Sequence, residues 1–178
     1  MSYVQYDGTD DWFISPTITP GIDKAQVFAG VRKLSDAASG VLLETSTNLS
    51  SNNGALLIWA PLNSGAISYA LQSKGTIGVT AATGTTFLAP ITNVLTGICD
   101  IAGDVATLRV NGTQVATSAT DQGTGNYLAY PLYVGRRGGT SLPFNGRLYQ
   151  LLVRFGANLD ASTIAATESF VNSRTGAF

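Results

Sequence analysis

The sequence predicts an all-β protein, a layered antiparallel β-sandwich with one short C-terminal α-helix. Three observations carry this prediction. Apolar residues alternate with other residues in many short segments, turn-forming residues separate these segments at frequent intervals, and a helical pattern occurs only near the C-terminal end. The 178 residues can bury a sizeable core without disulfides, and we expect a single domain over residues 1–178.

The clearest strand runs from Arg147 to Phe155, where two alternating sets of residues differ in polarity and one set is nearly all apolar. It follows a short strand at Leu132–Val134, a glycine-rich basic loop at 135–139 and a turn at 143–146. We expect this stretch to supply neighbouring strands of a layered core.

Most of the remaining chain also shows the strand pattern. We expect strands at Ser2–Tyr6, Asp11–Ser15, Ala25–Leu34, Gly40–Thr45, Ala55–Ala60, Ala66–Leu71 and Thr92–Ile101. The fifth and sixth of these would pair across a turn at 61–65. The weaker stretch Lys74–Ala89 would hold one or two short edge strands.

A β-hairpin is predicted at Val105–Thr117. Its centre is Asn111-Gly112, the dipeptide that a two-residue type I′ turn prefers because both central positions need positive φ. The loop at 121–130 that follows is long enough to reach across one end of the domain.

The C-terminal helix is expected over about residues 160–174. Asp160 is placed to cap its start and Gly176 to end it. A narrow stripe for docking on the sandwich would consist of Ile164, Phe170 and Val171.

Composition narrows the class of function. Only 12% of the residues are charged, and the net charge is -1 with no basic run, which argues against a nucleic-acid partner. Histidine is absent, so catalysis by a Ser-His-Asp or Cys-His arrangement is excluded. The single cysteine, Cys99, lies in an apolar run and is interpreted as a small buried hydrophobe. No apolar run reaches the roughly 18 residues of a membrane span, so membrane insertion is not expected.

Four segments, in this order, resemble the laminin-G-like branch of the concanavalin A-like lectin/glucanase superfamily. They are Tyr6–Phe13, Leu108–Val115, Leu132–Leu148 and Leu159–Ile164. The resemblance implies a jelly roll of two antiparallel sheets that acts as a non-catalytic glycan- or protein-binding unit.

Modules of this kind are frequent in bacteriophage structural and tail proteins, so the resemblance further implies a virion surface protein. It would be a capsid decoration or a tail or fibre module, assembled in several copies with other virion proteins in the host cytoplasm and released with the particle. Two functions compete within this hypothesis. One is a face that binds host cell-surface glycans, and the other is a purely structural decoration without a ligand.

A calcium site is one interpretation of Asp7, Asp10 and Asp11, because calcium prefers oxygen ligands and a glycine turn can present several carboxylates. The alternative is a solvated turn whose carboxylates accept hydrogen bonds from backbone N–H groups. No cofactor is required under either interpretation.

Aromatic side chains are candidates for stacking on a sugar ring. The chain offers Trp12, Trp59, Tyr69, Tyr127, Tyr130 and Tyr133. We favour core packing for Trp12 and Tyr133, which lie in strands. Trp59 precedes a turn and Tyr127 lies in a glycine-rich loop, so for these two we keep both interpretations. Together with Tyr69 they form the aromatic part of the predicted ligand site.

Arg136 and Arg137 add the only concentrated positive charge. On a glycine-rich loop they would hold the carboxylate of an acidic sugar or of a neighbouring subunit, and the alternative is a solvated hairpin end. Glycoside hydrolysis needs a pair of carboxylates on a groove. The chain has only two glutamates, Glu44 and Glu168, and Glu44 is interpreted as an isolated acid at an exposed strand edge. We therefore expect no enzymatic activity.

Overall fold

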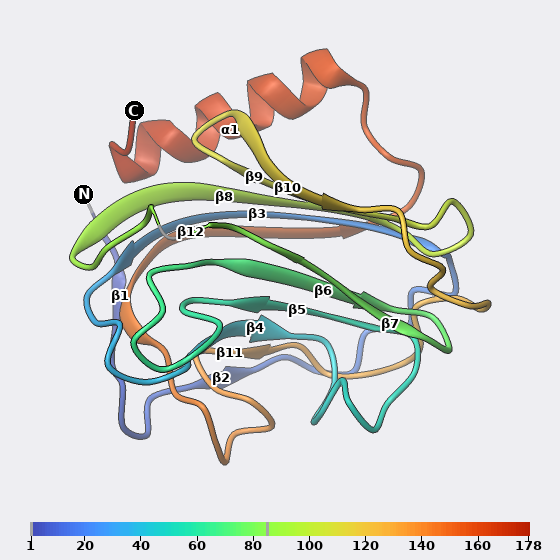
Figure 1. Ribbon diagram of the computed structural model, residues 1–178, viewed down its shortest axis with the longest axis horizontal. Helices are drawn as coiled ribbons and strands as arrows, with labels where there is room; N and C mark the ends of the chain where they lie inside the picture. Colours follow the sequence, from blue (N-terminus) through green and yellow to red (C-terminus); the bar gives the residue numbers. More distant parts are fainter. Residues whose placement is uncertain (1, 85) are drawn as a thin grey trace.

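The computed structural model describes residues 2–84 and 86–178 and consists of three layers (Figure 1). Two curved six-stranded sheets pack face to face, and one helix lies on the outer face of the first sheet. The predicted all-β jelly roll with one C-terminal helix is confirmed. Among the described residues, no helix has both the length and the apolar character needed to cross a membrane.

Sheet A has the strand order β1-β12-β3-β8-β9-β10. These strands are β1 (Val4–Asp7), β3 (Lys24–Lys33), β8 (Ile91–Asp100), β9 (Val105–Val110), β10 (Thr113–Ser118) and β12 (Asn145–Phe155). Sheet B has the order β2-β11-β4-β5-β6-β7. Its strands are β2 (Phe13–Ile14), β4 (Val41–Glu44), β5 (Ala55–Trp59), β6 (Ala70–Lys74), β7 (Gly78–Ala82) and β11 (Tyr133–Val134).

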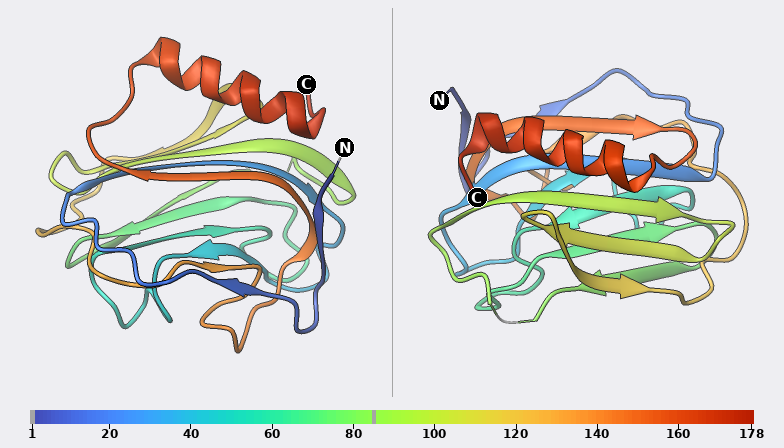
Figure 2. Two further views of the ribbon diagram at one scale, coloured as in Figure 1. Left: turned by 180° about the vertical axis from the view of Figure 1, so that it is seen from behind. Right: turned by 90° about the horizontal axis from the view of Figure 1, so that it is seen from above.

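Every pairing between these strands is antiparallel. The edge strands β10 and β7 lie against each other and close one side of the sandwich. At the opposite side the edges are β1 and β2, the first two strands of the chain. The two ends of the chain lie at the same end of the molecule, near the last turn of α1 (Figure 2).

The main core lies between the sheets and is built from alternate residues of nearly every strand, as the strand period of two requires. Cys99 is fully buried there, which confirms its interpretation, and burial raises the pKa of its thiol to about 12. The predicted loop at 121–130 does reach across one end of the sandwich, because Tyr127 N donates to Ile22 O and Leu128 N donates to Gly54 O.

The hairpin and the helix form where the sequence predicts them. Asn111 and Gly112 have φ of 51° and 77°, as a type I′ turn requires. The helix α1 (Ala161–Thr175) begins after Asp160, whose side chain accepts from Thr163 N, and ends at Gly176 in the left-handed region.

The docking stripe of α1 differs in one residue from the prediction. Ile164 and Val171 are buried against sheet A as expected, but Phe170 is 46% exposed. Glu168 takes part in the docking instead, because its carboxylate pairs with Arg109 of β9 at 2.8 Å. The stripe is therefore partly polar, which the apolar pattern alone does not reveal.

One strand prediction needs correction. The predicted strand at 66–71 is shifted, because Ile67 O and Tyr69 O accept from Phe87 N and Thr83 N beyond β7, and β6 begins only at Ala70. The prediction for the weak stretch at 74–89 is confirmed, because this stretch contains one short edge strand, β7.

The alternation along β12 is interrupted by a β-bulge. Leu148 pairs with Val31 and Gln150 pairs with the adjacent Gly30, so Tyr149 is an extra residue. Because of this insertion Leu148 faces the core, and so does Leu151 three positions later. A continuous period of two is thus wrong for this strand.

Gly30 lets α1 approach sheet A closely. A Cβ added at this position would lie far inside van der Waals distance of Thr175 Oγ1 and 3.1 Å from Thr175 Cβ. We predict that Gly30→Ala lowers the free energy of unfolding by about 1–3 kcal/mol, because overpacking displaces the end of the helix. Urea denaturation measures this loss. The double variant Gly30→Ala/Thr175→Ala should recover part of it, and a defect unchanged by the second substitution would show that helix docking is not its cause.

Candidate functional site

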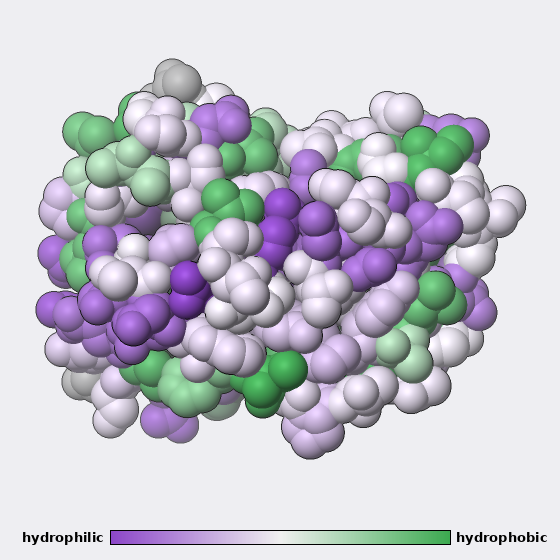
Figure 3. Space-filling view, turned by 90° about the horizontal axis from the view of Figure 1, so that it is seen from below, coloured by the Kyte–Doolittle hydropathy of each residue, from purple (hydrophilic) through white to green (hydrophobic). Residues whose placement is uncertain are grey.

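The outer face of sheet B carries a row of side chains that cross four strands. Glu44 pairs with Leu57, Leu57 with Gln72, and Gln72 with Thr80, so these four residues lie side by side and point away from the core. Hydrophilic residues form a band across the middle of this face, with hydrophobic residues toward its margins (Figure 3).

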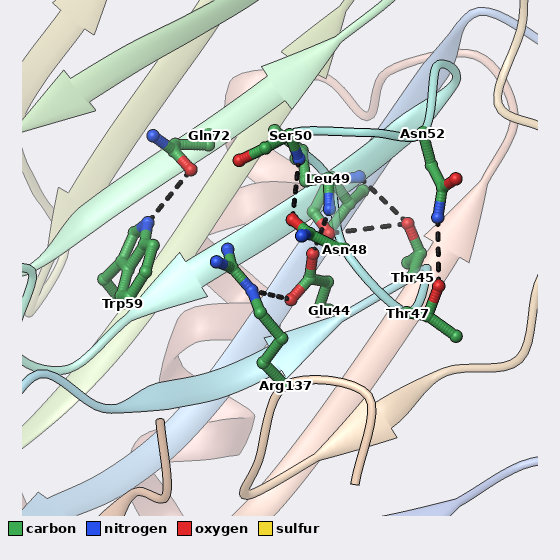
Figure 4. Close-up of polar contacts among 11 residues, drawn as sticks. Glu44, Thr45, Thr47, Asn48, Leu49, Ser50, Asn52, Trp59, Gln72 and Arg137 are labelled. Carbon is green, nitrogen blue, oxygen red and sulfur yellow. Dashed lines mark hydrogen bonds and ion pairs between the residues drawn. The ribbon is translucent and has the colours of Figure 1, made fainter. Parts of the chain in front are cut away.

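A chain of hydrogen bonds fixes the middle of this row. Trp59 Nε1 donates to Gln72 Oε1 at 3.0 Å (Figure 4). Gln72 Nε2 in turn donates to Thr80 Oγ1 at 2.9 Å. The Gln72 amide therefore has a set orientation, and Trp59 is 8% exposed beneath its neighbours. A planar amide and an indole held in this way form a rigid surface rather than a mobile one.

Arg137 reaches over the same indole from the glycine-rich loop. Its guanidinium carbon lies 4.9 Å from the centre of the Trp59 ring, a cation–π arrangement. Its Nε donates to Glu44 Oε2 at 2.9 Å, so the guanidinium lies between a carboxylate and an aromatic face (Figure 4). Within residues 2–84 and 86–178, no hydrogen bond uses the two terminal nitrogens of Arg137.

Glu44 is the buried anchor of the cluster. Its side chain is 0% exposed, and Oε1 accepts from the backbone N–H of Leu49 while Oε2 accepts from Arg137. Burial raises the pKa of Glu44, and the hydrogen bonds from Arg137 and Leu49 lower it by less. The expected exposed edge position for Glu44 is wrong, because β4 lies inside sheet B between β11 and β5.

Lys74 holds the loop at 45–54 from the other side. Its Nζ donates to Leu49 O at 3.1 Å and to Ser50 O at 2.9 Å. Beside this lysine lies a surface cavity of about 260 Å³. Its lining residues are Leu49, Ser50, Gln72, Lys74, Gly78, Val79 and Thr80. The cavity thus combines an ammonium, an amide and two hydroxyl groups with a short apolar floor.

The structure brings together Trp59 and Arg137 of the predicted ligand residues. Arg136 lies on the same loop, but its Nη2 donates to Thr140 O at 2.9 Å and it does not line the cavity. Tyr69 and Tyr127 were expected at the ligand surface, which is wrong. Tyr69 is 0% exposed and Tyr127 is 1% exposed.

The two buried tyrosines satisfy their hydroxyl groups inside the core. The Tyr69 hydroxyl accepts from Asn93 at 3.0 Å, and the Tyr127 hydroxyl bonds Ser73 at 2.7 Å. Burial raises the pKa of both hydroxyls. Of the other aromatics, Tyr133 is buried as expected, whereas Trp12 is 39% exposed. The two rings stack with their centres 6.0 Å apart.

The aspartates of the first turn bind backbone N–H groups. Asp7 Oδ1 accepts from Thr9 N at 2.7 Å, and Asp11 Oδ2 accepts from Asp7 N at 3.0 Å. In the part of the chain that the structure describes, no group of three or more acidic or metal-ligating side chains is arranged to hold a metal ion. This geometry agrees with the solvated turn and gives the calcium interpretation no support.

Three residues of the site were missed from the sequence: Glu44 as the anchor, and Gln72 and Lys74 as cavity residues. Gln72 and Lys74 lie two positions apart on β6. Because the predicted strand ended at Leu71, neither could be assigned to an outward face. Alternation along a strand ending at Lys74 would have placed both on the same side.

Comparison with known proteins supports the fold. No protein-family model matches the chain, and no curated protein matches its sequence. Solved structures do match. One is the CBM40 of the Ruminococcus gnavus IT-sialidase bound to α2,3-sialyllactose, with a TM-score of 0.63 and 14% identity over 88% of this chain and 98% of that one. The chain has a concanavalin A-like fold.

Two further structures show the breadth of this likeness. A heptameric SAP-like pentraxin from Limulus polyphemus has a TM-score of 0.70 and 12% identity, covering 92% of this chain and 80% of that one. Domains LG4-5 of the mouse laminin α1 chain have a TM-score of 0.64 and 16% identity, covering 88% of this chain and 42% of that one. At such identities the likeness establishes the fold, and the chemistry of the site has to be argued from this chain's residues.

The buried ion pair of Glu44 and Arg137 predicts that replacing each residue by uncharged glutamine lowers the free energy of unfolding by a different amount. Arg137→Gln leaves Glu44 as an unpaired buried carboxylate and should cost about 3–5 kcal/mol of unfolding free energy at pH 7. Glu44→Gln removes the charge that burial disfavours and should cost clearly less. Urea denaturation of both variants measures the difference. A cost for Glu44→Gln as large as that for Arg137→Gln would contradict this account.

The same pair predicts a pH dependence. The folded pKa of Glu44 is raised above its ordinary value of 4.5, so the folded state binds the proton more readily than the unfolded state. The stability that this carboxyl contributes therefore falls as pH rises from about 4.5 through the raised value. The defect of Arg137→Gln should accordingly shrink when unfolding is measured at pH 5 instead of pH 7.

Proposed function

We propose that this protein is a non-catalytic glycan-binding module that uses the outer face of sheet B. The observation that carries the proposal is the cavity beside the Trp59–Gln72–Thr80 chain of hydrogen bonds. Its polar groups are fixed by protein contacts before a ligand arrives, which lowers the entropic cost of binding. Amide, hydroxyl and ammonium groups around an apolar floor suit the hydroxyl groups and ring faces of a sugar.

The charges at this face favour an acidic saccharide. Lys74 lines the cavity, and Arg137 keeps its terminal nitrogens without a partner among the described residues. Glu44, the acidic partner of the Arg137 Nε, is fully buried beneath Arg137. A ligand would therefore meet positive charge, and a carboxylate is the group that a guanidinium and an ammonium bind well. The CBM40 structure with sialyllactose shows that this fold can carry such a ligand.

The arrangement of carboxylates supports a non-catalytic role. Both glutamates are engaged in ion pairs, Glu44 with Arg137 and Glu168 with Arg109. A glycosidase needs two carboxyl groups flanking the scissile bond. The cavity on sheet B is lined by no acidic residue.

A glycan array, with acidic and neutral saccharides and with and without calcium, tests the proposal. We expect binding to acidic saccharides that Gln72→Glu and Lys74→Gln each weaken by about tenfold or more, because each change removes a favourable charge or adds a repulsive one. Gln114→Ala, on the exposed strand β10 of the other sheet, is the matched control and should bind like the wild type. Absence of selective binding by the folded wild-type protein would overturn the proposal.

We further place this module on a bacteriophage particle, as a capsid decoration or a tail or fibre module. The low content of charged residues and the abundance of Thr, Ser, Asn and Gly in the sequence support this placement. Mass spectrometry of purified particles, followed by immunogold labelling, would locate the protein. Its absence from particles of a phage that encodes it would refute the placement.

A second candidate is a structural decoration without a ligand, and one observation favours it. The open side of the sandwich exposes large apolar side chains of the first two strands and their flanks, namely Tyr3, Val4, Trp12, Phe13 and Ile14. Exposed apolar groups of this size on edge strands are typical of protein contacts. Under this alternative Phe13→Ser would impair incorporation into the particle while the glycan array stays unchanged. Normal incorporation of Phe13→Ser would exclude this edge as the contact.

A further inference from the structure

The outer face of sheet A carries an unusual pair of arginines just beyond the last turn of α1. Arg32 of β3 and Arg147 of β12 are directly opposite each other in the strand register. Both point away from the core, because their neighbours Val31 and Leu148 are buried in it. Like charges directly opposite on adjacent strands destabilise a sheet unless an anion compensates them.

Neither arginine has a hydrogen-bond or ion-pair partner among the residues that the structure describes, although Arg147 lies over the ring of Tyr3. The Nε atoms of Arg32 and Arg147 are buried without a hydrogen bond, and no carboxylate forms an ion pair with either. Asp7, on the adjacent edge strand, accepts from Thr9 N instead. The exposed Arg174, in the last turn of α1, also forms no ion pair among these residues.

The absence of any hydrogen bond to a protein oxygen among the described residues sets these three arginines apart from the others. The other arginines each donate to a protein oxygen: Arg109 to Glu168, Arg136 to Thr140, Arg137 to Glu44 and Arg154 to Gln26. Of the three without such a bond, two are adjacent across strands and the third lines the cavity described next.

A cavity of about 300 Å³ lies between the last turn of α1 and β12, the strand that carries Arg147. It is lined by Ser2, Tyr149, Gln150, Ser173 and Arg174. Tyr3 connects it to the pair, because its ring packs on Tyr149 at 5.7 Å and lies 4.5 Å from the guanidinium carbon of Arg147. The β-bulge in β12 explains why the consecutive residues Tyr149 and Gln150 both line this cavity, which a regular strand would not allow.

We propose that Arg32, Arg147 and Arg174 form a binding site for an anionic saccharide that carries sulfate or phosphate ester groups. Guanidinium groups bind such oxyanions through paired N–H donors, and three of them match a ligand with more than one negative charge. Tyr3 and Tyr149 offer aromatic surface to a sugar ring, and Gln150 and Ser173 offer polar groups to its hydroxyls. The site lies on the face opposite the sheet B cavity and does not depend on it.

Isothermal titration calorimetry with a heparin-derived sulfated hexasaccharide tests the proposal. Separate titrations with mannose 6-phosphate, inorganic sulfate and inorganic phosphate distinguish sulfate from phosphate esters and saccharide from free anion. We expect Arg32→Gln/Arg147→Gln to bind the hexasaccharide, or the phosphorylated sugar if that is the ligand, at least about tenfold more weakly than the wild type. The control Lys24→Gln/Arg136→Gln removes the same charge away from this site and should bind normally.

Thermal unfolding separates binding from a structural role. Without a ligand, Arg32→Gln/Arg147→Gln should melt at or above the wild-type temperature, because it removes a repulsion between like charges. The bound saccharide should raise the melting temperature of the wild type and not that of this variant. Four results would each overturn the proposal. These are equal weakening in the control variant, wild-type affinity in the arginine variant, binding of free anions alone, and no binding at all. A failure here leaves the glycan array result for sheet B unaffected.

Discussion

The packing of sheet A on sheet B is the constraint on which the rest of the structure depends. A strand presents alternate residues to opposite faces, so once one face of each sheet is committed to the shared core, every remaining side chain is assigned to an outer face. Each outer face must then be covered or made polar. Sheet A is covered largely by α1, and sheet B by two loops that the buried pair of Glu44 and Arg137 holds in place.

The two outer faces are consequently different chemical surfaces. On sheet B the charges are paired and the polar groups are connected to one another, from Glu44 through Arg137 and Trp59 to Gln72 and Thr80. On sheet A, beyond the end of the helix, Arg32 and Arg147 form no hydrogen bond or ion pair with any residue that the structure describes. The first surface is preorganised by its own contacts, whereas the second has an excess of unneutralised positive charge.

Local patterns in the sequence were sufficient for much of the fold. The Asn111-Gly112 turn, the Asp160 cap and the apolar strands could be predicted because each depends on residues close together in the chain. Features that depend on pairing between distant strands could not be predicted in this way. The bulge at Tyr149 is visible only against the partner strand, and the burial of Glu44 follows from the position of β4 inside the sheet.

The candidate site was predicted less completely for the same reason. Trp59 and Arg137 were found because an aromatic beside a turn and a basic glycine-rich loop are recognisable without a structure. Tyr127 fits the same description but is buried, because its loop folds back over the end of the sandwich. Gln72 and Lys74 are ordinary residues in the sequence, and they acquire a role only through their neighbours on β5 and β7.

The extra residue in β12 also affects how this chain should be compared with others. The inserted Tyr149 shifts the alternation of β12 by one position. Even-numbered residues therefore face one side of the sheet before the bulge and the opposite side after it. An alignment that places a gap even one residue away would exchange buried and exposed positions for part of the strand. Substitution patterns in β12 can therefore be interpreted only when both segments are counted separately from the inserted tyrosine.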